Sequence, residues 1–372
     1  MSPRFTIDGS DGLESHLAAT CEQVLSGVKS LVPLARLDGI LLGGGYGRGE
    51  GGVLKTADGD QPYNDLEFYV FLRGQAILAE RTFRQPLHEL GESLSPAAGL
   101  EVEFKVLTLD KLRRSPPSMF YYDLVAGHRW QLGEDALLAG CEQHRDAVHI
   151  PLHEATRLLM NRCSGLLYAA ERLARPHFGA AEADFVGRNL AKAQLAFGDV
   201  LLAANGQYHW SCRERHTRLT KLSRLENLPL EEFLRQHATG VEFKLHPTRS
   251  TETREILSAR HAELSAVGQQ LWLWLEAKRL GTRFATPRDY AFSGADLCPE
   301  TSVWRNRLVN ARAFGGSGLA CGRYPRERLF RSLALLLWEQ NEFGKVRSEL
   351  RSDATDFTGL VSAYENLWKR FN

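Results

Sequence analysis

Long apolar stretches are missing from this chain of 372 residues. The longest, Leu271–Leu275 and Leu333–Trp338, fall far short of the roughly 20 residues that a membrane-spanning helix needs. The first residues, Met1–Asp8, lack the apolar core of a signal peptide. These absences lead us to expect a cytoplasmic protein with no membrane partner.

Cysteine is scarce, and neither charge sign dominates. The six cysteines include no C-x-x-C pair, which argues against a disulfide framework and favours reduced thiols. The formal net charge of +1 argues against a broad polyanion-binding surface and makes long RNA the least favoured partner. An apolar fraction of 43% predicts a sizeable core, and the length favours two or three domains.

Several motifs are absent or incomplete. No G-K-[ST] follows the glycines, and no H-R-D or D-F-G is present, which excludes a P-loop and a protein kinase. Gly47-x-Gly49-x-x-Gly52 matches a dinucleotide fingerprint, but no crossover helix fits before Asp65. Weaker alternatives are a zinc site and a ribonuclease-type R-x(4–6)-H motif. Their residues are Cys141, His144, His149 and His153 for the first, and Arg172 with His177 or Arg254 with His261 for the second.

The first part of the chain alternates between helix and strand patterns. Apolar spacing predicts helices over residues 12–32 and 77–94, and strands over 37–42, 65–72 and 100–106. The turn-rich interval 51–64 is expected to be a loop. After Pro151, helical spacing predominates over residues 153–175, 182–205, 213–225, 230–237, 251–280, 302–314, 326–350 and 355–371. We therefore predict an α+β fold, with a mixed-sheet domain over residues 1–140 and an all-helical domain over 151–372.

A glycine turn and a group of carboxylates stand close together in the first domain. The turn Gly43–Glu50 contains Arg48 and suits a polyphosphate. Asp65 and Glu67 alternate along one strand, so their side chains are expected on the same face, roughly 7 Å apart at Cα. If the next strand lies alongside, Glu103 supplies a third carboxylate, with Glu101 as the competing candidate. Carboxylates so placed can share divalent metal ions.

This order of features resembles the DNA polymerase β-like nucleotidyltransferase superfamily. In that family a strand, a glycine turn and a short helix precede an Asp-x-Asp/Glu strand; here Gly44–Glu50 precedes Asp65-Leu66-Glu67. The glycine segment is most similar to that of bacterial uridylyltransferases that modify nitrogen-regulatory proteins. The resemblance covers about residues 37–107 and implies a mixed sheet with flanking helices.

The resemblance also implies roles for individual residues. Asp65 and Glu67 would bind two Mg²⁺ ions and Glu103 would match the third acidic position. Gly44 and Gly45 would offer backbone N–H groups to the triphosphate of an NTP, such as ATP, and Arg48 would contact it. The family reaction is transfer of a nucleoside monophosphate to an acceptor hydroxyl with release of pyrophosphate.

The helical domain is expected to select the acceptor. Lys192 lies one helical turn after Arg188 and is a candidate cation for the triphosphate, although a solvated basic face would have the same spacing. A small molecule or a protein is favoured as acceptor over long RNA. Because the second and third carboxylates are glutamates, a catalytically inactive nucleotide-binding or protein-interaction module is the alternative.

Overall fold

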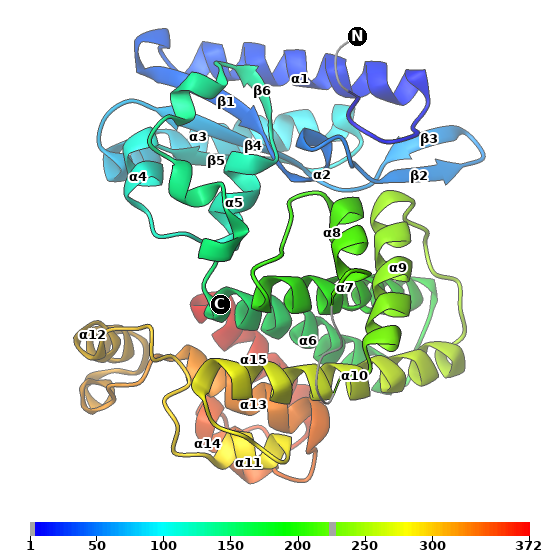
Figure 1. Cartoon of the computed structure of the whole chain (residues 1–372), viewed down its shortest axis with the longest axis vertical. Helices are drawn as coiled ribbons and strands as arrows, with labels where there is room; N and C mark the ends of the chain where they lie inside the picture. The colour runs from blue at the N-terminus through cyan, green and yellow to red at the C-terminus, as the bar shows by residue number, and fades with distance from the viewer. Residues whose placement is uncertain (1–3, 223–227) are drawn as a thin grey trace. The chain divides into compact units, whose positions relative to one another are not determined.

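The computed structural model describes residues 4–222 and 228–372 and divides into two compact units (Figure 1). Unit 1 consists of Met1–Pro151, Asn205–Lys221 and Val241–Thr248, and unit 2 of Leu152–Ala204, Leu222–Gly240 and Arg249–Asn372. This differs from the predicted division, because two segments from beyond residue 151 belong to unit 1. In the described residues, no helix combines the length and the apolar character needed to cross a membrane.

Unit 1 is built on a four-stranded mixed sheet of order β5-β4-β1-β6. β1 (Leu37–Leu42) lies antiparallel to both β4 (Leu66–Leu72) and β6 (Arg129–Leu132). β5 (Val102–Leu107) lies parallel to β4 and forms the sheet edge. The three strands predicted from the sequence are confirmed, and the chain has the expected coarse α+β character.

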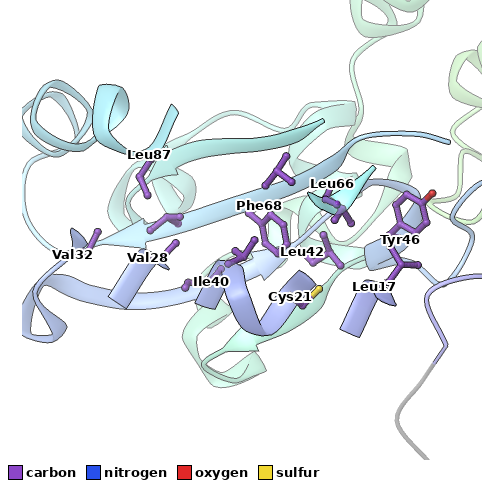
Figure 2. Packing of buried hydrophobic residues seen from close by; sticks show 14 of the residues in the cluster. Leu17, Cys21, Val28, Val32, Ile40, Leu42, Tyr46, Leu66, Phe68 and Leu87 are labelled. Carbon is purple, nitrogen blue, oxygen red and sulfur yellow. The ribbon is translucent and has the colours of Figure 1, made fainter. Parts of the chain in front are cut away.

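Two long helices cover one face of this sheet. Both α1 (Asp11–Leu31) and α3 (Ala76–Ala98) were predicted from their apolar spacing. Their buried side chains pack against alternate residues of β1 and β4, because every second strand residue points to the same face (Figure 2). This cluster includes Leu17, Cys21, Val28, Ile40, Leu42, Leu66, Phe68 and Leu87.

The opposite face of the sheet is only partly covered. Tyr69, Phe71 and Leu107 pack there in a second, smaller cluster with residues of α4 (Leu109–Arg114) and α5 (Met119–Ala126). Alternation places the side chains of Glu67 and Glu103 on this same face. Glu67 of β4 and Glu103 of β5 thus lie on the face of the sheet that the two long helices do not cover.

The prediction of a loop over residues 51–64 is wrong. This interval forms a hairpin of β2 (Val53–Thr56) and β3 (Gly59–Pro62), with Val53 paired to Pro62. Gly59 has φ of +115°, which a glycine tolerates in a tight turn. β3 has no buried residue, so its sequence carries no apolar alternation from which a strand could be predicted.

All the regular elements described in unit 2 are helical, as expected. They are α6 (Leu152–Ala174), α7 (Ala180–Ala204), residues 230–240 of α9 (Leu230–Leu245), α10 (Arg254–Leu280), α11 (Pro287–Phe292), α12 (Val303–Phe314), α13 (Arg326–Trp338), α14 (Phe343–Leu350) and α15 (Phe357–Phe371). The helix predicted over 213–225 corresponds to α8 (Cys212–Leu219) in unit 1, and its residues 223–225 lie outside the described part. Short 3₁₀ helices span Leu34–Arg36, Asp135–Leu138, Glu142–His144, Ala147–His149 and Gly316–Ala320.

Candidate functional site

The glycine turn is packed tightly against the end of β1 and the start of β4. Its short helix α2 (Gly44–Gly47) begins directly after Gly43. The Gly43 N–H donates to the Glu67 carbonyl at 2.9 Å. A Cβ on Gly47 would lie 2.1 Å from the Leu42 carbonyl oxygen, so only glycine fits. Gly44 adopts φ of +60° and lies directly against the Glu67 side chain. The turn and the second predicted carboxylate are therefore neighbours.

The Tyr46 side chain attaches the turn to the hairpin that follows. It is fully buried, its hydroxyl donates to the Gly52 carbonyl at 2.9 Å, and the same hydroxyl accepts the Tyr63 N–H at 3.0 Å. These two bonds hold both ends of the β2–β3 hairpin close to α2. The interval between the glycine turn and Asp65 therefore does not separate the turn from the carboxylates.

Two of the three predicted carboxylates lie side by side on adjacent strands. In the parallel pairing of β4 and β5, Glu67 is the register partner of Glu103. Asp65 immediately precedes β4 and is partly buried, whereas the competing candidate Glu101 is exposed and precedes β5. The strand order that the sequence left open thus brings Glu103 next to Glu67.

Lys105 lies between these two glutamates, and sequence reasoning assigned it no role in the site. Its Nζ is 3.5 Å from Glu67 Oε2 and 3.6 Å from Glu103 Oε2. It also lies over the Tyr69 ring, 5.5 Å from the ring centre. Strand alternation was the available signal, because it places Lys105 on the same face as Glu103.

The environment of each carboxylate shifts its pKa differently. Burial opposes ionisation of Glu67, but the Tyr69 hydroxyl, which donates to Glu67 Oε2 at 2.6 Å, and Lys105 outweigh it and lower the pKa. Burial and the neighbouring Glu67 charge raise the pKa of Asp65. Burial also raises the pKa of Glu103, against the opposing effect of Lys105. Glu67 is thus the carboxylate held ionised, and Asp65 the one whose charge is only partly compensated.

Lys244 is a second cation that sequence reasoning missed. It lies in Val241–Thr248, which the structure assigns to unit 1, and its Nζ would be 3.3 Å from a Cβ on Gly45. Burial, followed by the charge of Arg48, lowers the pKa of Lys244, while Asp65 attracts its charge. No local pattern identifies this lysine, because it reaches the glycine turn only through the tertiary fold.

Arg48, predicted to contact the triphosphate, makes structural contacts within unit 1. Its Nε donates to the Gly44 carbonyl at 2.8 Å and its Nη1 to the Trp210 carbonyl at 2.9 Å, with Asp123 Oδ2 3.3 Å from Nη1. These contacts attach the glycine turn to α5 and to the segment that precedes α8. The role of Arg48 at the triphosphate stays a prediction. Its observed contacts hold the glycine turn in position.

The next acidic residue, Glu50, has a similar tethering role. Its Oε1 accepts the Ser211 hydroxyl at 2.5 Å, and its Oε2 accepts the Cys212 N–H at 2.8 Å. Because Ser211 is the N-cap of α8, the carboxylate also balances the positive end of that helix. Glu50 and Arg48 together explain why the segment 205–221 belongs to unit 1.

The donor set fits one divalent cation better than two. Mg²⁺ requires oxygen ligands in a near-octahedral arrangement. Asp65 and Glu67 Oε1 offer such oxygens, and the raised pKa of Asp65 marks a carboxylate that a cation would stabilise. The Lys105 ammonium, however, already contacts both Glu67 and Glu103 and would compete with a second ion for these two carboxylates. Over residues 4–222 and 228–372, no three His, Cys, Asp or Glu side chains converge as a ready-made metal site.

The remaining sequence candidates belong to other parts of the fold. Lys192 lies exposed on α7 in unit 2, so its role toward a nucleotide stays a prediction. In the Cys141 cluster, buried His144 bonds to the Leu112 carbonyl at 3.0 Å, a contact typical of a core histidine. In the R-x(4–6)-H pattern, His261 bonds to the Leu166 carbonyl at 2.9 Å.

Comparison of the chain with protein-family models, with curated proteins and with solved structures finds no match. The functional argument therefore rests on the residues of unit 1 themselves.

Proposed function

We propose that this protein transfers a nucleoside monophosphate from an NTP to an acceptor hydroxyl and releases pyrophosphate. The observation that carries the proposal is the placement of Asp65 and Glu67 beside the glycine turn, with the Lys244 ammonium against Gly45 on the same turn. A turn that approaches phosphates closely, carboxylates for a cation and an ammonium group beside the turn are the groups that this chemistry requires.

A divalent cation held by Asp65 and Glu67 would supply charge neutralisation at the phosphate oxygens. The other tasks fall to side chains of this chain. The acceptor oxygen forms a bond to the α-phosphorus as the bond from that phosphorus to the β-bridging oxygen breaks. The electron pair of the broken bond leaves with pyrophosphate, and Lys244 is the candidate that balances this charge.

The proton of the acceptor hydroxyl needs a base. Glu103 is the candidate, because burial raises the pKa of its carboxyl toward the range in which a base accepts a proton effectively. The side chain also remains accessible, with 38% of its surface exposed. Lys105, 3.6 Å away, would keep Glu103 oriented and ionised between turnovers.

Incubation of the full chain with each of the four NTPs and Mg²⁺ tests the proposal. We expect one NTP to raise the melting temperature and, with an acceptor present, to yield pyrophosphate and a product heavier by one nucleoside monophosphate. Glu67→Gln should remove both effects, whereas Glu101→Gln, an exposed neighbour, should retain them. If no NTP with Mg²⁺ shifts the melting temperature, the proposal fails.

One observation favours the alternative of a catalytically inactive nucleotide-binding module. Lys105 neutralises the two glutamates that an active two-metal enzyme would leave free. Such a module would bind an NTP and be stabilised by it, yet release no pyrophosphate with small hydroxyl compounds or proteins as acceptors. Binding and turnover measured on the same samples therefore separate the two functions.

A further inference from the structure

Helix α12 in unit 2 buries two amide side chains and exposes large apolar ones. Asn306 and Asn310 are buried, although both are amides. Four large apolar side chains of α12 and of the adjoining 3₁₀ helix Gly316–Ala320 are instead exposed. Their exposed fractions are 52% for Val303, 74% for Trp304, 63% for Leu308 and 52% for Leu319. A globular surface helix has the reverse arrangement.

Hydrogen bonds hold the helix in this orientation. The Asn306 side chain donates to the Gly322 carbonyl at 2.9 Å, and the Asn310 side chain donates to the Arg323 carbonyl at 2.7 Å. Gly318 approaches so closely that a Cβ would lie 2.3 Å from the Asn310 carbonyl oxygen. The hairpin of α12 and the 3₁₀ helix stands out from the rest of unit 2 (Figure 1). Its apolar face is thus presented outward by specific contacts.

Arginine surrounds this apolar face. From Thr301 to Arg326 the sequence contains five arginines and no aspartate or glutamate. Arg305 and Arg312 are exposed on α12, and the Arg307 guanidinium lies over the Trp304 ring at 5.1 Å. At the end of the helix, Arg351 and Arg370 each donate to a carbonyl of its last turn at 3.4 Å.

We propose that this hairpin docks on the surface of an anionic lipid membrane. An amphipathic helix with Trp and Leu on its apolar face and arginines around it lies in the interface between headgroups and acyl chains. A second copy of the chain would bring like charges together, and a nucleic acid would leave Val303, Leu308 and Leu319 in water. The contact is peripheral and spans nothing, so it revises the expectation that no membrane takes part.

Flotation of the full chain with vesicles tests this proposal. Vesicles of phosphatidylcholine with about one third phosphatidylserine should bind the protein, pure phosphatidylcholine vesicles should bind it much less, and added salt should weaken binding. Arg305→Gln with Arg312→Gln should reduce partitioning onto anionic vesicles roughly thirtyfold, and Trp304→Ser roughly tenfold.

Matched controls are available on exposed positions of unit 1. Ile77→Ser removes an exposed apolar side chain and Arg114→Gln removes an exposed charge, and both should bind vesicles like the unchanged chain. The proposal is overturned if the unchanged chain binds neither vesicle, or binds both equally, or if Trp304→Ser binds as before. Polyuridylate binding without vesicle binding, or a dimer that Trp304→Ser dissociates, would assign the surface to RNA or to a second copy instead.

Discussion

Glu67 in unit 1 and Glu276 in unit 2 are both glutamates that accept a tyrosine hydroxyl and face a cation, yet their surroundings differ. Glu276 is fully buried, and each of its oxygens has two donors. Thr156 and the Nε of Arg279 donate to Oε1 at 2.7 and 2.9 Å, and Tyr290 and the Nη2 of Arg279 donate to Oε2 at 2.9 and 2.6 Å. Glu67 directs only Oε2 toward Tyr69 and Lys105 and keeps a quarter of its side chain exposed.

Under the proposed function, this difference separates a structural carboxylate from one that would bind a cation. A carboxylate offers about four acceptor positions, and those of Glu276 are filled by donors from the protein. Glu67 directs only one of its two oxygens toward such donors. Its neighbour Asp65 has a raised pKa because burial and the Glu67 charge outweigh the attraction of Lys244 and Lys105. A cation bound by Asp65 and Glu67 would supply the positive charge that the protein's own side chains supply at Glu276.

The largest effect should come from Asp65→Asn, which removes a carboxylate oxygen from the proposed cation site. We expect transfer to fall roughly 1000-fold, because charge stabilisation at the phosphates is lost. The melting temperature should stay the same or rise, since burial already disfavours the Asp65 charge. Pyrophosphate release and thermal unfolding measure the two effects. Asp58→Asn, in the exposed hairpin turn, should change neither, and full turnover by Asp65→Asn would contradict the assignment.

Glu276→Ala, in contrast to Asp65→Asn, should lower the stability of the fold. It leaves the Arg279 guanidinium buried without its carboxylate, and losing one partner of a buried pair costs about 3–5 kcal/mol. Chemical denaturation of the full chain should show this loss, while Glu231→Ala, an exposed glutamate of α9, should cost only a few tenths. A loss below about 1 kcal/mol for Glu276→Ala would show that the network is not structural.

Glu327 is a third carboxylate for this comparison, and its effect on stability should depend on pH. Burial raises its pKa from 4.5 to about 7, with Arg323 and Arg331 3.5 and 3.6 Å from its Oε2. The folded chain then retains a proton that the unfolded chain releases, so stability falls as pH rises from about 4.5 to about 7. Above that range the penalty approaches about 3 kcal/mol.

Glu327→Gln removes this titration. The variant should melt at a higher temperature than the unchanged chain at pH 8 and at nearly the same temperature at pH 5. Thermal unfolding across this range is the measurement, and a difference that does not vary with pH would refute the raised pKa.

The smallest effect should come from Lys105→Met, which opens the position between Glu67 and Glu103. We expect the unchanged chain to bind one Mn²⁺ and the variant to bind a second, with the magnetic coupling of two neighbouring ions. Electron paramagnetic resonance of bound Mn²⁺ counts the ions. Lys111→Met, an exposed lysine of α4, removes the same charge without opening the site. Two Mn²⁺ ions on the unchanged chain would show that Lys105 does not hold this position.

The regular elements of unit 1 were largely predictable because their packing is periodic. Val24 and Val28 of α1, or Leu66 and Phe68 of β4, repeat at the spacing of a helix or a strand with one buried face. The β2–β3 hairpin was missed because β3 buries nothing. A strand that is held by backbone pairing alone leaves no hydrophobic pattern in its sequence.

The candidate site was predictable only where it lies within one element. Alternation along β4 correctly opposed Glu67 to Leu66 and Phe68. Lys244 could not be inferred, because about 200 residues separate it from Gly45, which its side chain reaches. The internal contacts of Arg48 with Asp123 and Trp210 were hidden for the same reason.

By itself, the sequence determined the long helices, the strands β1, β4 and β5, the glycine turn and the shared face of alternating carboxylates, since these follow from local geometry and the spacing of apolar residues. Only the tertiary structure decided that Glu103 stands beside Glu67, that Lys105 lies between them and that Lys244 reaches Gly45. It likewise turned the asparagines of α12 inward and Trp304 outward. The physical reason is that strand order, and contacts between segments distant in sequence, depend on how whole surfaces pack, which no short pattern encodes.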